Sequence, residues 1–147
     1  MPIDKQEANR MPNRETKQDV VPRHDAHLNI LLRSEKLYTG QEIIRLYKDG
    51  TRDFSFINAE GADLSDADLP EINFEGANLR RMKGENTNFQ GANFTNANLE
   101  DSNLYLANFN GANLRSAIMK NSNLNLANLF GANIDLIDLE GAEGIYD

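Results

Sequence analysis

The sequence predicts an all-β solenoid, in which one short unit repeats along the chain and successive units stack on one another. One observation is a large apolar residue at every fifth position between residues 54 and 139, with Ala59 and Gly84 as exceptions. Another is a small residue, usually Ala, two positions earlier, with Asn or Asp between the two. The apolar centres are Phe54, Leu64, Leu69, Phe74, Leu79, Phe89, Phe94, Leu99, Leu104, Phe109, Leu114, Met119, Leu124, Leu129, Ile134 and Leu139. Self-similarity at a fixed period is typical of solenoid proteins.

The spacing of five residues excludes a continuous helix or strand. Five residues advance an α-helix by roughly 500°, and five is odd, so an unbroken strand would alternate the faces of successive centres. The small residue and the centre lie two apart and therefore face the same side of a short extended segment. The chain must then turn at the remaining two positions, and the second is commonly Gly, Asn or Asp, as at Gly61, Asp66 and Asn86.

The unit Ala-Asn/Asp-Leu/Phe, followed by two turn residues, resembles the A(D/N)LXX motif of the pentapeptide-repeat family. Its copies run in phase from Asp53 to Glu143. The resemblance implies that residues 52–147 form a right-handed quadrilateral β-helix of about four and a half coils, with four repeats in each coil.

A column of charges gives an independent indication of the coil length. Coils of twenty residues place residue n beside residue n+20, and one turn column then alternates in sign: Glu60, Arg80, Glu100, Lys120, Glu140. Adjacent strands lie about 4.8 Å apart, so opposite charges there attract and like charges repel. Coils of fifteen residues would instead place Glu60 beside Glu75. The alternation favours four-sided coils.

The same stacking predicts the interior. One wall holds Phe54, Phe74, Phe94, Leu114 and Ile134, and its neighbour holds Leu69, Phe89, Phe109 and Leu129. Gly84 follows Met82 and Ala59 follows Ile57, so each irregular repeat keeps its apolar volume and reads as a packing variant. A void beside Gly84 is the alternative. Outward Asn columns such as Asn73, Asn93, Asn113 and Asn133 predict side-chain ladders between coils.

The N-terminal third differs in composition. Residues 1–27 are polar and contain Pro2, Pro12 and Pro22, which predicts a disordered tail. This tail lacks the apolar core of a signal peptide or a membrane span, so we expect a cytoplasmic protein without membrane contact.

Residues 28–51 are predicted to cap the first coil. Leu28 to Arg33 fits either a helix or a strand. A helix near 40–48 is clearer, because Thr39 and Glu42 form a capping-box pattern and Gly50 supplies a stop. The open end of a solenoid needs such a cover. At the other end, Ile145 and Tyr146 are expected to close the last coil.

No residue qualifies as catalytic, and the sequence predicts no enzyme, cofactor or metal site. The chain has no Cys, and it shows no phosphate-loop, dinucleotide or metalloprotease motif. His24 and His27 flank Asp25 but lack further His or Cys ligands to complete a metal site. Asp63, Asp66 and Asp68 occupy ordinary repeat positions without the spacing of a calcium loop.

Acidic residues dominate a chain whose formal net charge is −8. The densest run contains no base: Glu60, Asp63, Asp66, Asp68, Glu71, Glu75. Direct binding to a nucleic-acid backbone is therefore not expected, and a solubilising surface is the plainer reading. Some pentapeptide-repeat proteins resemble duplex DNA and inhibit a DNA topoisomerase, so the resemblance implies an acidic DNA mimic as an alternative function. A rod of about 20 Å with an alternating charge column fits mimicry poorly.

The remaining expectation is a protein-interaction or scaffold module. Stacking by twenty places Leu106, Leu126 and Tyr146 in one turn column, with Tyr105 and Phe130 at adjoining outward positions. Contiguous apolar patches often mark interfaces, so this stripe predicts homodimerisation or docking of an unidentified protein partner. The alternative is local packing of Leu against its neighbours at the corner.

Overall fold

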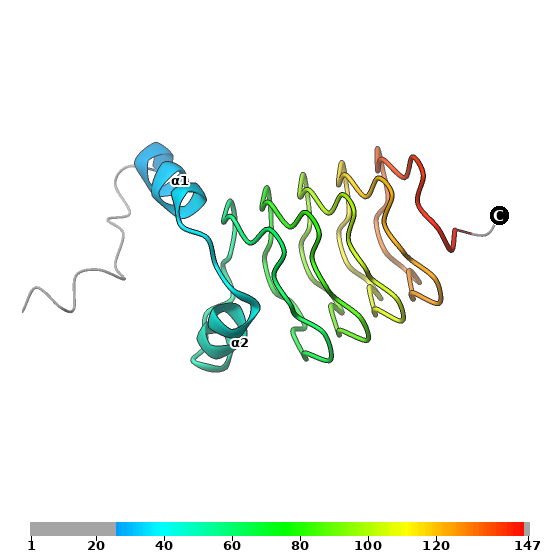
Figure 1. Ribbon diagram of the computed structural model, residues 1–147, viewed down its shortest axis with the longest axis horizontal. Coiled ribbons are helices and arrows are strands. Elements are labelled where there is room, and N and C mark those ends of the chain that lie inside the picture. Colours follow the sequence, from blue (N-terminus) through cyan, green and yellow to red (C-terminus); the bar gives the residue numbers. More distant parts are fainter. Residues whose placement is uncertain (1–25, 146–147) are drawn as a thin grey trace, which may run out of the picture.

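The structure is a computed structural model that describes the backbone of residues 26–145 and the side chains of residues 31–145. Most of the predicted tail, together with His24 and Tyr146, lies outside the described residues, as does the side chain of His27. Within the described part, two helices precede a stack of coils: α1 (Ala26–Glu35) and α2 (Gly40–Lys48). The helices lie at one end of the rod and residue 145 lies toward the other (Figure 1).

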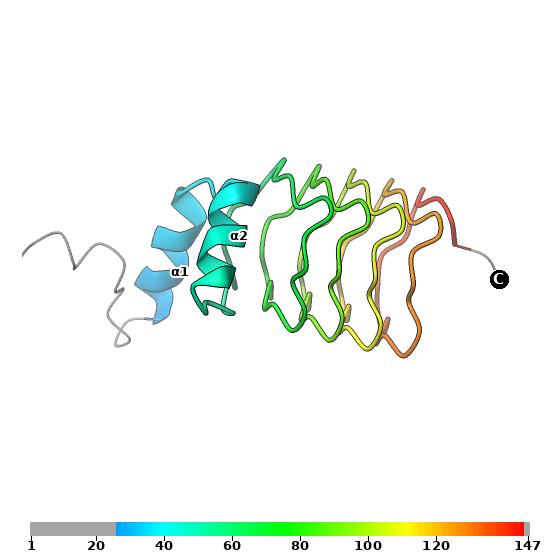
Figure 2. The ribbon, with the colours of Figure 1, turned by 90° about the horizontal axis from the view of Figure 1, so that it is seen from below.

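The coils are held in register by parallel bridges between residues twenty positions apart. Bridges such as Asp53 to Asn73, Asn58 to Asn78, Asp63 to Lys83 and Asp68 to Asn88 define the four sides of the coil. Figure 2 shows the same stack from a perpendicular direction, with each coil displaced along the rod from the one before. The described backbone is therefore a four-sided β-helix.

A tight turn at every corner closes the coil. From residue 56 to residue 141, every fifth residue has a positive φ, including Gly61 at 70° and Leu126 at 59°. Across such a corner the Ala62 N–H donates to the Ala59 carbonyl oxygen at 3.0 Å. The outward Asn fixes the approach to the turn, as when Asn73 Oδ1 accepts the Glu75 N–H at 3.1 Å. These side-chain bonds explain why the repeat carries Asn or Asp before its centre.

The interior is a ladder of large apolar side chains. Phenylalanine rings stack along two walls, with centroids 5.5 Å apart for Phe74 and Phe94 and 5.4 Å apart for Phe89 and Phe109. Phe89 and Phe94 meet edge to face at 5.1 Å, so the two walls pack against each other. Such aromatic pairs contribute about 0.5–1.5 kcal/mol each beyond burial. In the predicted wall that begins at Phe54, burial extends only to Leu114, because Ile134 is 49% exposed.

Gly84 is a packing variant without a void beside it. A Cβ placed on Gly84 would lie 2.9 Å from Leu104 Cδ2 and 3.4 Å from Met82 Cε, so neighbouring side chains already fill the space. Where a hydroxyl replaces the small apolar residue, it donates to a backbone carbonyl: Thr87 Oγ1 lies 2.7 Å from the Leu64 oxygen. These substitutions keep the interior full and its polar groups satisfied.

The outward Asn ladders form on part of the rod. Asn93 Nδ2 donates to Asn73 Oδ1 at 3.0 Å, as predicted. Asn113 and Asn133 instead accept the backbone N–H two residues later, at 3.1 and 3.0 Å. The amide column therefore mixes ladder bonds between coils with turn bonds inside one coil.

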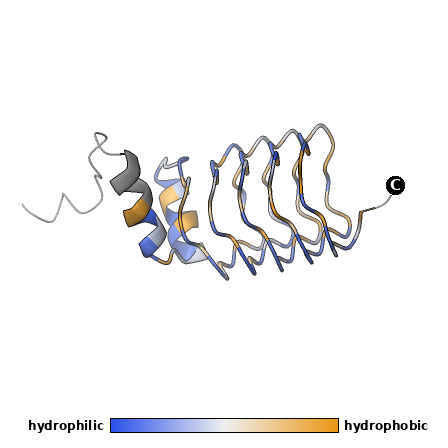
Figure 3. Cartoon of the chain, turned by 90° about the horizontal axis from the view of Figure 1, so that it is seen from above, coloured by the Kyte–Doolittle hydropathy of each residue, from blue (hydrophilic) through white to orange (hydrophobic). Residues whose placement is uncertain are grey.

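Two helices and a short extended segment lie over the first coil. The capping box of α2 has Glu42 N–H donating to Thr39 Oγ1 at 3.2 Å and Thr39 N–H donating to Glu42 Oε2 at 3.1 Å. Ile43 is completely buried against the coil, and the Tyr47 hydroxyl donates to the Pro70 carbonyl oxygen at 2.7 Å. Orange apolar segments on the helices and coils are separated by blue polar ones (Figure 3).

The segment before α2 pairs with the coil edge, and α1 is tied to it by charge. Leu37 forms a parallel bridge with Asn58, whose carbonyl oxygen accepts the Tyr38 N–H at 2.8 Å. The segment Leu28 to Arg33, which the sequence leaves open between helix and strand, is helical in α1. Arg33 Nη1 lies 3.2 Å from Asp53 Oδ2, which joins α1 to the first face of the coil.

Burial of Leu104 predicts that the rod does not tolerate a charge there. Leu104 is 0% exposed at the centre of a middle repeat. Leu104→Asp would bury an unpaired carboxylate at a cost of about 3 kcal/mol or more, a large share of a domain's stability. We expect loss of cooperative thermal unfolding in circular dichroism. Leu106→Asp is the control, since Asp66 occupies the same corner column. Melting of both variants within about 2 °C of the parent would contradict the inward assignment.

The Arg33 to Asp53 contact predicts an acid-sensitive position of α1. Burial raises the pKa of Asp53, but hydrogen bonds from Ser55 and the charge of Arg33 lower it by more. A carboxyl with a depressed folded pKa stabilises the fold above its unfolded pKa, and this stabilisation is lost as pH falls through the folded value. Amide shifts of α1 should therefore change as the pH falls below about 4, and Asp53→Asn should abolish that step. An identical titration in the Asn variant would contradict the role of Asp53.

Candidate functional site

The strongest candidate surface is an apolar corner of the rod, called the Leu corner here and formed by Tyr105, Leu106 and Leu126. Leu106 and Leu126 are 44% and 66% exposed. Both residues have φ of 59°, a left-handed conformation that Gly, Asn and Asp adopt more readily than Leu. Earlier members of the same column are Asp66 and Asn86. The corner thus exposes large apolar side chains where the backbone favours small polar ones.

Phe130 lies at the next corner and does not extend the Leu corner directly. Between the two corners runs a polar face, the amide face, formed by Asp68, Asn88, Asn108 and Asn128. Its amides bond along the rod: Asn108 Nδ2 donates to Asn88 Oδ1 at 3.0 Å, and Asn128 Nδ2 donates to Asn108 Oδ1 at 3.3 Å. The predicted continuous stripe is therefore two apolar edges with an ordered amide face between them. Tyr146, its fifth predicted member, lies outside the described residues.

The acidic run does not gather on one side of the molecule. Twenty residues complete one coil, so the run spreads over all four corners and two of the four sides: Glu60, Asp63, Asp66, Asp68, Glu71, Glu75. Several of these carboxylates have partners, as where Asn88 Nδ2 donates to Asp68 Oδ1 at 2.7 Å and Asn86 Nδ2 to Asp66 Oδ1 at 2.9 Å. A hydrogen bond from the backbone of Ser65 lowers the pKa of Asp63. The predicted acidic patch is an acidic ring around the first coil.

The alternating column forms some of its expected ion pairs. Arg80 Nε lies 3.4 Å from Glu100 Oε2, although this buried Nε has no partner in hydrogen-bonding geometry. Lys120 Nζ lies 2.9 Å from Glu140 Oε2 and 3.4 Å from Asp138 Oδ2. Hydrogen bonds to Glu140 and Asp138 raise the pKa of Lys120. Exposed pairs of this kind contribute less than about 1 kcal/mol each and mainly support the register.

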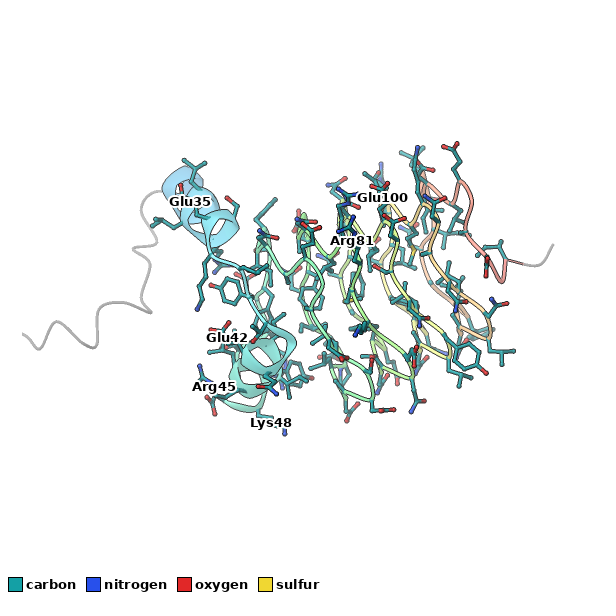
Figure 4. The ribbon with its side chains drawn as sticks, viewed as in Figure 1. Glu35, Glu42, Arg45, Lys48, Arg81 and Glu100 are labelled. Carbon is teal, nitrogen blue, oxygen red and sulfur yellow. The ribbon has the colours of Figure 1, made fainter. Side chains whose placement is uncertain are left out.

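Neighbouring turn positions complete the charge pairing. Glu60 forms an ion pair with Arg81 at 3.9 Å, and no ion pair between Glu60 and Arg80 is present among the described residues. Figure 4 labels Arg81 and Glu100 on the same edge of the rod. The charges on this edge are therefore largely balanced and give no uniform negative surface.

The described residues contain no feature of a metal or membrane-spanning site. No group of three or more His, Cys, Asp or Glu among them could hold a metal ion. Neither of the described helices is long and apolar enough to cross a membrane. A surface hollow of about 510 Å³ is lined by three acids and two bases, among them Asp63, Lys83 and Glu85, so its lining carries both signs of charge. This hollow offers no convergent set of groups for catalysis.

Sequence reasoning missed two exposed residues, Ile118 and Leu136. Ile118 occupies an outward position that holds Asn in the three preceding coils and is 36% exposed. Leu136, with φ of 58°, is 76% exposed at a third corner. Stacking by twenty could have found both, because Ile118 follows Asn98 in its column and Leu136 follows Ser116.

The repeat pattern and the four-sided coil can now be compared with known proteins. Residues 58–81, 72–111 and 107–143 match the family model for pentapeptide repeats, in 8 copies. The chain belongs to the pentapeptide-repeat family. Members of this family form right-handed quadrilateral β-helices, the architecture that the bridges and corners describe here. No curated protein sequence matches the chain.

Solved structures of other pentapeptide-repeat proteins resemble this chain. The crystal structure of alr5209 from Nostoc PCC 7120 has 32% sequence identity and a TM-score of 0.53, covering 65% of this chain and 75% of that one. Rfr23 from the cyanobacterium Cyanothece 51142 has 30% identity and a TM-score of 0.49, covering 63% and 59%. HetL from Nostoc sp. strain PCC 7120, described as involved in heterocyst differentiation regulation, has 32% identity and a TM-score of 0.46, covering 63% and 42%. This chain therefore spans less than two thirds of the length of Rfr23 and of HetL.

Proposed function

We propose that this chain is a non-enzymatic protein-interaction or scaffold module, with the Leu corner as its binding surface. The observation that carries the proposal is the exposure of Leu106 and Leu126 in left-handed turn positions. Local packing alone would favour Asn, Asp or Gly there, because a left-handed residue with a large side chain costs roughly 1–2 kcal/mol. A partner that buries both side chains explains why Leu stands at these two stacked corners.

The amide face adds polar, hydrogen-bonding groups to this surface. Asn88, Asn108 and Asn128 form a hydrogen-bonded row beside the Leu corner, and Phe130, 78% exposed, borders the row on its other side. A partner that covers the face would meet an apolar margin, a row of amides and an aromatic side chain. Protein interfaces combine such aromatic and aliphatic anchors with polar groups. A protein partner therefore suits this surface, and a second copy of the chain is one such partner.

A covered first coil is the second property that suits a scaffold. We infer that α2 is the N-terminal cap of a β-helix of about four and a half coils, since an uncovered first coil would expose its interior and its backbone edge. Burial of Ile43 and the bond from Tyr47 to Pro70 support the capping role. A cytoplasmic location stays a prediction from the sequence.

The acidic DNA mimic is the second candidate and has less support. Its basis is the net charge of −8 and the acidic ring. The carboxylates of that ring lie at all four corners of the coil, and several are bonded to amides or bases. A mimic of duplex DNA needs extended rows of negative potential. Inhibition of a purified topoisomerase at about micromolar protein would favour mimicry over the scaffold role.

Replacing both leucines of the Leu corner should separate binding from folding. In Leu106→Asn/Leu126→Asn, both new residues tolerate the left-handed turn, as Asn86 does in the same column. We expect a melting temperature equal to or above that of the parent, and at least a fivefold loss of partner capture from a host extract. Sedimentation velocity would show whether a homodimer is lost at the same time.

A matched control changes two left-handed corners outside this surface. Arg81→Asn/Ser116→Asn alters the same backbone type, with φ of 57° and 56° in the parent. This control should keep both partner capture and sedimentation. If the Leu corner variant also keeps both, the surface is not an interface and its leucines pack only locally.

A further inference from the structure

One peptide group of the coils joins an Asn to a Gly, at Asn110 and Gly111. This pair occurs nowhere else in the sequence, and every other Asn of the coils precedes a residue with a side chain. The backbone nitrogen that follows an Asn can attack Cγ of the Asn side chain, and a residue without a Cβ hinders this attack least. Asn is accordingly one of the thermolabile residues of proteins. The sequence therefore places its most reactive Asn at a corner in the middle of the rod.

Two neighbouring coils hold the backbone of this pair. The Asn110 carbonyl oxygen accepts the Gly91 N–H at 2.9 Å, and the Gly111 N–H donates to the Phe130 carbonyl oxygen at 2.9 Å. The Asn110 N–H donates to Asn108 Oδ1 at 3.0 Å, and Gly111 has a left-handed φ of 66°. The peptide group between Asn110 and Gly111 is thus bonded to the coil before it through its oxygen and to the coil after it through its nitrogen.

These bonds oppose the attack on Cγ. The Gly111 nitrogen must lose its proton and come within bonding distance of Cγ of Asn110, which requires the peptide group to rotate out of the ladder. Rotation would break the bonds to Gly91 and Phe130, and Asn110 is half-buried as well. Local opening of the coil removes these constraints, and such openings need a free energy between zero and that of global unfolding. The reaction rate should therefore follow the population of the opened coil.

We propose that Asn110 is a site of spontaneous deamidation, which the intact rod suppresses and which opening of its coil exposes. In the opened chain the Gly111 nitrogen, after losing its proton to solvent, bonds to Cγ of Asn110. The bond between Cγ and Nδ2 breaks, and Nδ2 takes up a proton and leaves as ammonia. Water then adds to one of the two carbonyls of the cyclic succinimide and opens it. The products are aspartate, or isoaspartate in which the backbone runs through the former side chain. Water is the only co-reactant.

Deamidation changes the charge and the length of the chain at this corner. Either product places a carboxylate between Gln90 and Phe130, the uncharged residues of the same column, and beside the amide face. Isoaspartate also adds one carbon atom to the backbone. The repeats from Asp53 to Glu143 contain no insertion, and their bridges join residues twenty positions apart. An added backbone atom disturbs this register, so the isoaspartate product should form a less stable rod than the aspartate product.

The test compares the full chain in native buffer and in urea at the same mildly alkaline pH. Peptide mapping by mass spectrometry follows the gain of about 1 Da at residue 110 that accompanies replacement of the amide by an acid. We expect deamidation to be at least about tenfold faster in urea, where no coil holds the Gly111 nitrogen. Hydrogen exchange of the Gly111 N–H in native buffer measures the opening of the same coil independently.

Two variants separate the chemistry from the opening. Asn110→Gln copies Gln90 and Gly91, the pair one coil earlier, and should abolish the mass gain at this position because its longer side chain closes a ring more slowly. Leu129→Ala removes a partly buried centre from the following coil. It should raise hydrogen exchange at Gly111 and deamidation at Asn110 by the same factor. If this variant does not fold, urea below the unfolding midpoint replaces it, and both rates should again rise together.

A third variant is the matched control for the products. Asn110→Asp carries the new carboxylate without the added backbone atom, so it should melt within about 2 °C of the parent. The isoaspartate chain, separated by chromatography after incubation in urea, should melt lower or fail to refold. Equal melting of the two chains would contradict the effect on register.

The remaining outcomes decide the site and its suppression. Absence of the mass gain at residue 110 in urea would exclude Asn110 as a deamidation site. Equal rates in urea and in native buffer would show that the rod does not suppress the reaction, and so would exchange at Gly111 that rises without faster deamidation. None of these results bears on the proposed interaction module, because Leu106→Asn/Leu126→Asn tests that function through partner capture.

Discussion

A left-handed backbone at every fifth residue is the constraint on which this structure depends. Each positive φ turns the chain by one corner, and four corners return it to a position one strand spacing above its start. Only then can a backbone N–H such as that of Phe54 reach the carbonyl of Asn73, and only then do Phe74 and Phe94 stack. Turn chemistry, hydrogen bonding and core packing in this protein are three consequences of one conformational requirement.

This requirement also explains which parts of the fold the sequence could predict. The five-residue period and the alternating charges from Glu60 to Glu140 define the coil length, and the filled space beside Gly84 follows from conserved volume in its own repeat. Capping-box residues Thr39 and Glu42 identify α2 for a local reason, since their bonds lie within four residues. Leu28 to Arg33 stayed open between helix and strand because the apolar pattern there is too short to decide.

The candidate site was harder to predict, because it depends on where side chains lie around the circumference. Asp66 and Glu75 are close in sequence but lie at different corners. The run of acids in the sequence therefore forms a ring around the coil in the structure. Phe130 and Leu126 are four residues apart and lie at successive corners, with Asn128 and its amide face between them. Exposure of Ile134 had a different origin. It depends on the absence of a covering coil among the described residues, which its own repeat does not encode.

The exposed left-handed leucines link this constraint to function. The turn itself does not require a large apolar corner residue, because Gly131 and Asn121 make the same turn. Leu106, Leu126 and Leu136 make it with a less favourable residue type and leave the side chain in solvent. All three lie in the C-terminal half of the rod, away from α1 and α2. The rod is therefore asymmetric, with α1 and α2 at one end and the exposed left-handed leucines in the other half of the described coils.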